Sequence, residues 1–268
     1  MWKNIKSAFS IWNVLRGTRS NDLDRQVSMP ISLVVIGDET MFEGLVNRLG
    51  ARAKVSRSEP GGEIADGDGQ ILLDARKLLS ISESDFEDTL GKIAIRHAER
   101  RIALAAAFPA FRSQVVNQIS HEWALKNAKL AAISALPGII PLTDWLMPVT
   151  SAGDLYLLTK NQILLLLEVA ACYGRPANPS ARIKELLPVV GGAFGWRAVA
   201  RELIGLVPGG VGVAVKSAVA YAGTYTVGRA AAYFYAGNGR KMNDLQMGNV
   251  LKGAITEAVR RGKAMLSR

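Results

Sequence analysis

The residues that come nearest to a known chemical motif lie in the segment ISLVVIGDETMFEGLVNRLG, residues 31–50. A β-branched run leads to Gly37 and then to a helical pattern, the order found in a phosphate-binding loop of the form G-x-x-x-x-G-K-[ST]. With Gly37 as the first glycine, Phe42, Glu43 and Gly44 take the places of the second glycine, the lysine and the hydroxyl residue. The frame of the motif is present, but the residues that contact phosphate and Mg²⁺ are replaced.

These replacements reverse the chemistry of a phosphate site. Phe42 places a bulky side chain where backbone must approach phosphate, Glu43 supplies a negative charge in place of a positive one, and Gly44 has no oxygen for a metal ion. Two interpretations stay open at this point: an ordinary strand–helix turn with a chance glycine, and a degenerate P-loop fold. With either one we expect no bound nucleotide and no cofactor.

Other combinations of catalytic residue types are incomplete. His121 and Glu122 begin the zinc-protease pattern H-E-x-x-H, but Leu125 stands at the place of the second histidine. Cys172, the single cysteine, lies in an apolar run with no histidine placed near it by sequence, so we interpret it as a core residue. Neither a zinc-ligand spacing nor a calcium-loop pattern occurs. We therefore predict that the protein is not an enzyme and has no catalytic or metal site.

The elements around the glycine turn alternate between strand and helix patterns. We expect strands at 31–36, 52–56, 70–75 and 101–108, and helices at 40–49 and 82–99. Ser82 is a typical residue to open the second helix. Strands separated by helices predict a parallel sheet, so residues 31–110 read as a small α/β module, shorter than a complete GTPase domain and without a base-recognition N-K-x-D motif.

After Pro109 the sequence becomes strongly apolar. A helix over about 112–127 precedes four stretches that are each about as long as a hydrocarbon core is thick, at 129–150, 154–174, 183–205 and 209–237. We therefore predict an α+β, mostly α fold, in which the α/β module is followed over 111–237 by an apolar helical domain of two helical hairpins.

Charged residues interrupt the four apolar stretches. A charge at the centre of a bilayer costs about 2.5 kcal/mol or more unless it is paired. A hairpin that folds back at residue 152 brings Asp144 level with Lys160, and a second one near 207 or 208 brings Glu202 almost level with Lys216. We predict that these residues form paired charges inside the hairpins.

Basic amphipathic segments flank the two regions. In residues 1–30, a helix with Trp2, Phe9 and Trp12 on one side and Lys3 and Lys6 on the other precedes a polar linker. Such a helix suits a membrane surface, although a helix docked on its own protein stays open. Residues 238–268 contain a second basic amphipathic helix over 243–266. This helix fits a cap on the bundle and a lipid surface equally well.

The formal net charge of +10 favours an anionic partner. No nucleic-acid recognition motif occurs and the basic residues lie beside apolar helices, so we expect membrane lipids with an anionic surface and no nucleic acid. The turns at 151–153 and 206–208 hold no Lys or Arg, whereas the middle connection and both ends of the chain are basic. The positive-inside rule then places both termini on the cytoplasmic face.

The region from about 108 to 234 contains three segments whose order is typical of a known family. ALPGIIPLTDWL, LTKNQILLLLEVAACYG and GAFGWRAVARELIGLVPGGVGVAVKSAVAYAGTYTVGRAAAYF follow one another in this order. The region resembles the YcjF-type bacterial domain of unknown function, a membrane-associated helical domain often found C-terminal to an Era-like GTPase domain. The resemblance implies a helical domain at the bacterial inner membrane and no defined reaction. The N-terminal module would then be a truncated remnant of a GTPase domain.

The leading hypothesis is a non-enzymatic scaffold, or one component of an envelope complex, with a catalytically dead GTPase-like module. It would bind a protein partner or a second copy of itself. One alternative is a regulatory nucleotide-binding protein with an unconventional GTP or GDP site. Another is a soluble helical bundle that sequesters a lipid or a hydrophobic peptide.

Overall fold

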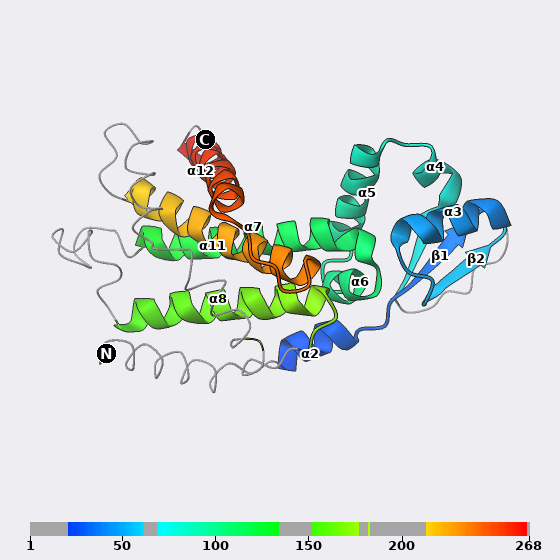
Figure 1. Ribbon diagram of the computed structural model, residues 1–268, viewed down its shortest axis with the longest axis horizontal. Helices are drawn as coiled ribbons and strands as arrows, with labels where there is room; N and C mark the ends of the chain where they lie inside the picture. The colour runs from blue at the N-terminus through cyan, green and yellow to red at the C-terminus, as the bar shows by residue number, and fades with distance from the viewer. Residues whose placement is uncertain (1–20, 62–68, 134–151, 177–181, 183–212, 267–268) are drawn as a thin grey trace. The chain divides into compact units, whose positions relative to one another are not determined.

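The structure, a computed structural model, describes residues 21–61, 69–133, 152–176, 182 and 213–266 (Figure 1). These residues fall into two compact units, and each is described by itself. The α/β unit comprises the described parts of 20–117 and 170–177, and the helical unit comprises those of 118–169 and 178–268. The chain is mostly helical, with a small parallel sheet in the α/β unit.

The sheet of the α/β unit has β1 (Ser32–Ile36) between β2 (Val55–Ser58) and β3 (Gln70–Asp74). Both pairings are parallel, with Leu33 level with Val55 on one side and Ile71 on the other. The middle three residues of β1 are all buried, which explains why this strand reads as a continuous β-branched run rather than as an alternating one. The predicted parallel sheet is confirmed, and its second strand begins three residues later than expected.

Local signals in the sequence correctly predict two helices of this unit. α3 (Glu39–Leu49) begins after Asp38 and ends at Gly50, whose φ of 76° is a conformation that glycine adopts without strain. α5 (Glu83–Arg96) begins after Ser82, as the sequence predicts. Between β3 and α5 lies the short helix α4 (Ala75–Leu79).

Two predictions for this unit are wrong. Residues 101–108 form no strand: they contain α6 (Arg101–Ala107), which leads into the short 3-10 helix η1 (Pro109–Phe111). A short apolar run has no periodicity that separates a buried strand from a buried helix, and its many alanines favour the helix. The predicted linker also contains α2 (Asn21–Ser28), which packs against α6 and buries Leu23.

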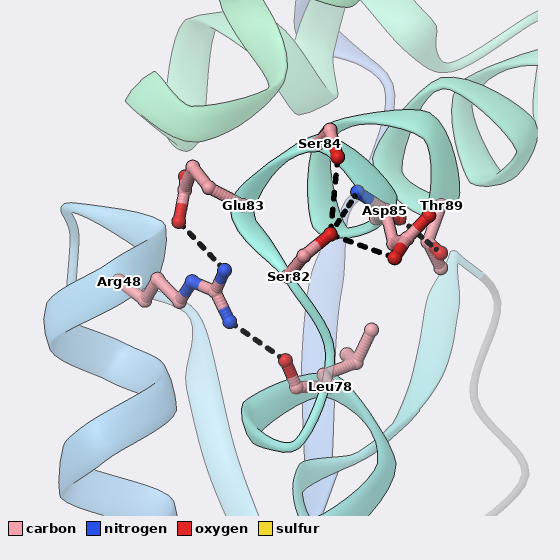
Figure 2. A network of polar contacts seen from close by, with 7 residues as sticks. All are labelled: Arg48, Leu78, Ser82, Glu83, Ser84, Asp85 and Thr89. Atoms are coloured by element: carbon pink, nitrogen blue, oxygen red, sulfur yellow. Dashed lines mark hydrogen bonds and ion pairs between the residues drawn. The ribbon is translucent and has the colours of Figure 1, made fainter.

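Arg48 on α3 holds the start of α5 in place (Figure 2). Its guanidinium donates one hydrogen bond of 2.8 Å to the carbonyl of Leu78 and another of 2.6 Å to the carboxylate of Glu83. The same group lies 3.8 Å from the centre of the Phe86 ring. The hydroxyl of Ser82 accepts the backbone N–H of Asp85, which caps α5 beside this contact. Four interactions therefore fix the start of α5 relative to α3 and α4.

The helical unit is built from α7 (Arg112–Ile133), α8 (Ala152–Cys172), α11 (Val213–Ala236) and α12 (Asp244–Leu266), with the first residues of α7 and the last of α8 in the α/β unit. The helices expected at 112–127, 154–174, 209–237 and 243–266 are confirmed, with α7 longer than predicted. No helix in the described part of the chain combines the length and the apolar composition that a bilayer crossing requires.

Contacts between side chains set the directions of the long helices. The indole of Trp123 bonds Glu168 and the amide of Asn127 bonds Asn161, so α8 runs antiparallel to α7. Asn127 also bonds Thr224, while the backbone of α11 four residues further on lies against Ser120, so α11 is antiparallel to α7 as well. α12 packs on α11 through a small apolar cluster of Ala222, Leu251, Ala254 and Ile255.

Candidate functional site

The turn between β1 and α3 is closed by groups of the chain itself. Gly37 is buried, and a Cβ atom at this position would lie 3.1 Å from the Cβ of Ala75 and 3.2 Å from that of Met41. The carboxylate of Asp38 accepts the backbone N–H of Met41 at 2.8 Å. Because Glu39 adds a second carboxylate in the first turn, an incoming phosphate would meet negative charge where a phosphate-binding loop offers free N–H groups.

The other positions of the degenerate motif serve packing and surface charge. Phe42 is 6% exposed and belongs to the core of the α/β unit. Glu43 forms a 2.8 Å ion pair with Arg52, whose guanidinium also lies 5.7 Å from the centre of the Phe42 ring. Gly44 lies against Leu79, which a Cβ would approach to 3.4 Å. The structure therefore brings the predicted residues together around one helix start, and each one has a structural role there.

A second set of polar groups, which the sequence analysis missed, lies inside the helical unit. The amide of Asn161 donates to the side-chain oxygen of Asn127 at 2.7 Å, and the amide of Asn127 donates to the hydroxyl of Thr224 at 2.9 Å. We call these three residues the asparagine bridge. Their exposed fractions are 5%, 0% and 1%, so the bridge joins α8, α7 and α11 out of reach of solvent. Buried amides of this kind are costly to leave unpaired, which makes the bridge a strong determinant of helix register.

An aromatic cluster also joins α7 to α11, nearer the N-terminus of α7. His121 and the hydroxyl of Tyr221 share a hydrogen bond through Nδ1, and the His121 ring lies 4.6 Å from the ring of Tyr225. The two tyrosines are one turn apart on α11, with parallel rings 6.3 Å between centres. Burial raises the pKa of Tyr225, Arg229 lowers it and Glu257 raises it further. His121, which begins an incomplete zinc motif in the sequence, therefore has a role in helix packing.

Glu168, one of the charges that interrupt the predicted apolar stretches, has a partner on α7. Its carboxylate accepts the indole N–H of Trp123 at 3.0 Å. The ammonium of Lys126 lies 4.3 Å from the centre of the same indole ring. The aromatic ring thus stands between a negative and a positive group, and an acid that looked unfavourable in the sequence is accommodated.

α7 and α11 lie close together at Gly228. A Cβ atom there would collide with the hydroxyl of Ser120 and lie 3.0 Å from its Cβ. Ser120 is fully buried, and its hydroxyl has no hydrogen-bond partner among the described residues. This crossing places the backbones of the two helices close together, and it fixes the level at which the asparagine bridge forms.

Several predicted site residues lie outside the described residues. These are Trp2, Lys3, Lys6, Phe9 and Trp12 of the N-terminal helix, and Asp144 and Glu202 of the paired charges. Lys160 on α8 and Lys216 on α11 are described, and both are half-buried. The two pairings stay predictions. The predicted apolar stretch 129–150 from residue 134 onward, and the whole of the stretch 183–205, also lie outside the described residues.

A signal for the asparagine bridge is present in the sequence in retrospect. Asn161 precedes the run QILLLL, and Asn127 and Thr224 also interrupt apolar helical patterns. A polar residue on the apolar face of a helix needs a partner, but the sequence does not show which residue supplies it.

The described residues contain no group of three or more His, Cys, Asp or Glu side chains that could hold a metal ion. Comparisons with protein-family models, with curated proteins and with solved structures found no match. The resemblance to the YcjF-type domain therefore rests on the quoted segments. In the α/β unit the start of α3 is closed by the chain's own groups. In the helical unit the buried polar groups of the asparagine bridge form hydrogen bonds between helices.

Proposed function

We propose that this chain is a non-enzymatic, membrane-associated bacterial protein that acts as a scaffold or as a component of an envelope complex. The observation that carries the proposal is the closed turn after β1. Asp38 occupies the helix start with its own carboxylate, Phe42 fills the core and Glu43 is paired with Arg52. A GTPase-like module of this form has a structural role and no phosphate chemistry.

Association with a membrane is supported by the composition of the chain and by its helical unit. The net charge of +10 attracts anionic surfaces, and the long helices α8 and α11 are largely apolar. The buried polar side chains of the asparagine bridge bond to one another. The attachment we propose is to the cytoplasmic face of the inner membrane.

The scaffold proposal predicts that purified protein does not bind a fluorescent guanine nucleotide at micromolar concentrations. A matched variant is Asp38→Asn, which removes the negative charge and keeps a side-chain oxygen that caps α3. Saturable binding by the unmodified protein, displaced by unlabelled GDP, would contradict the proposal and favour the nucleotide-binding alternative. Binding by Asp38→Asn alone would show that the Asp38 charge excludes the phosphate.

Fractionation of cells tests the membrane part of the proposal separately. We expect the protein in the membrane pellet, with extraction by alkaline carbonate distinguishing surface attachment from insertion. Recovery of nearly all the protein in the supernatant at low salt, before any carbonate, would contradict membrane association and favour the soluble bundle.

A further inference from the structure

One end of the helical unit brings together the last residues of α7 and the first residues of α8 and α11. The asparagine bridge places Asn127, Asn161 and Thr224 level with one another, and α8 and α11 both run antiparallel to α7. At a rise of 1.5 Å per residue, Ile133 lies about 9 Å beyond this level, Leu157 about 6 Å and Lys216 about 12 Å, all in the same direction. We call this part the lysine end: residues 128–133, 152–160 and 213–223.

Three of the four charged residues of the lysine end are lysines. They are Lys129, Lys160 and Lys216, and the fourth is Asp154 near the start of α8. Beyond the asparagine bridge in the other direction, the same helices of this unit carry two acids, Glu122 and Glu168, and two bases, Lys126 and Arg229. The lysine end therefore has a net positive charge, whereas the charges on the other side of the bridge balance.

Apolar side chains are exposed beside these lysines. Ile133 on α7 is 57% exposed and Leu157 on α8 is 43% exposed. Lys129 is exposed, and Lys160 and Lys216 are half-buried. A lysine can lay its aliphatic stem along apolar surface while its ammonium reaches toward polar groups. Apolar side chains flanked by lysines match the boundary between acyl chains and anionic headgroups.

We propose that the lysine end is the surface by which this protein docks on a membrane, and that its ligands are anionic phospholipid headgroups. The inference rests on the proposed function and adds to it the end of the molecule that faces the lipid. A nucleic acid would call for arginine and exposed aromatic residues that stack on bases. Among the side chains of the lysine end that the structure describes, the exposed large apolar ones are the aliphatic Ile133 and Leu157, which favours lipid.

Binding of the full chain to vesicles tests the proposal. The probes are vesicles of phosphatidylcholine alone and vesicles that also contain phosphatidylglycerol. The test variant is Lys129→Gln with Lys160→Gln, and the matched control is Lys77→Gln with Lys92→Gln, two exposed lysines of the α/β unit. Each lysine near an anionic surface contributes about 1 kcal/mol, which is about fivefold in partition coefficient, so the test variant should bind about 25-fold more weakly.

The control should bind phosphatidylglycerol vesicles as the unmodified protein does, and circular dichroism should show equal helix content for all three proteins. Equal binding by the test variant and the unmodified protein would overturn the proposal, as would an equal loss in the control. In either case membrane association itself would stand. If the unmodified protein binds neither kind of vesicle, the proposed function fails instead.

A fluorophore sensitive to polarity gives a second, independent measurement. Ile133→Cys places it at the lysine end, and Leu245→Cys places it on α12, where the neighbouring Gln246 bonds Tyr233 near the end of α11 and thus at the opposite end of the unit. Leu245 is 74% exposed, and the native Cys172 is fully buried and out of reach of the label. Vesicles should shift the emission to the blue at position 133 alone. An equal or larger shift at position 245 would overturn the proposal.

Discussion

The two units use polar side chains in different ways. In the α/β unit the bonds of Asp38, Ser82 and Glu43 lie at the surface and act locally, at helix starts and in ion pairs. In the helical unit Asn127, Asn161 and Thr224 are buried and connect separate helices. Surface pairs are screened by water, whereas a buried amide that loses its partner bears the full cost of desolvation. Polar side chains therefore act locally at the surface of one unit and specify the packing of helices in the other.

The largest effect is expected when the middle of the asparagine bridge is removed. Asn127→Ala leaves the amide of Asn161 and the hydroxyl of Thr224 buried without this partner and opens a cavity, so we expect a loss of about 3 kcal/mol in the free energy of unfolding. Urea denaturation followed by circular dichroism measures it. The control is Asn47→Ala on the exposed side of α3, which should change stability by less than about 0.5 kcal/mol.

A double-mutant cycle sharpens this prediction. Asn127→Ala with Asn161→Ala should cost clearly less than the sum of the two single losses, because each single variant orphans the other amide. Strictly additive losses would mean that the two side chains do not depend on each other. The contrast between the units would then lose its main support.

Gly228 and Gly253 offer a matched pair of glycine substitutions. Gly228→Ala drives a methyl group into Ser120 at the α7–α11 crossing and should destabilise the protein by about 2 kcal/mol. A Cβ atom at Gly253 on α12 would meet no described atom within 4 Å, so Gly253→Ala should stabilise the protein by about 0.5 to 1 kcal/mol through helix propensity. Thermal unfolding of both variants gives the comparison. A loss at Gly253 or a gain at Gly228 would contradict the packing described.

In the α/β unit, removing Arg48 and removing its partner Glu83 should cost different amounts of stability. Arg48→Met loses the bond to the Leu78 carbonyl, the ion pair and the contact with the Phe86 ring, and should cost about 1 kcal/mol. Glu83→Gln removes only the ion pair, whose carboxylate side chain is 73% exposed, and should cost less than about 0.5 kcal/mol. Chemical denaturation at low and high salt separates the contribution of the ion pair from that of the other Arg48 contacts. Equal losses would show that the ion pair dominates.

The smallest effect has the opposite sign. Ser120→Ala removes a buried hydroxyl for which the described residues offer no hydrogen-bond partner, and it keeps the side chain nearly the same size, so we expect a gain of about 0.5 kcal/mol. Differential scanning calorimetry of the variant measures it. A clear loss of stability would indicate that the hydroxyl has a partner in solution, such as a bound water molecule.

The sequence by itself determined the features that depend on neighbouring residues. The apolar run of β1, the serine before α5 and the glycine after α3 are local signals, and the parallel pairing of β1 with β2 agrees with the helix α3 between them. Local signals were insufficient at 101–108, where a short run of alanine and branched residues suits both a strand and a helix. The packing of α6 against α2 and η1 favours the helix there.

Only the tertiary structure decided which residues of the helical unit meet. Helical periodicity places Asn127, Asn161 and Thr224 within their own helices, but the level at which one helix lies against another depends on contacts such as that of Gly228 with Ser120. The same holds for Glu168, which reads as an unfavourable charge in an apolar stretch until Trp123 is placed beside it. Register between helices is set by packing across long separations in sequence, and no pattern within a single helix contains it.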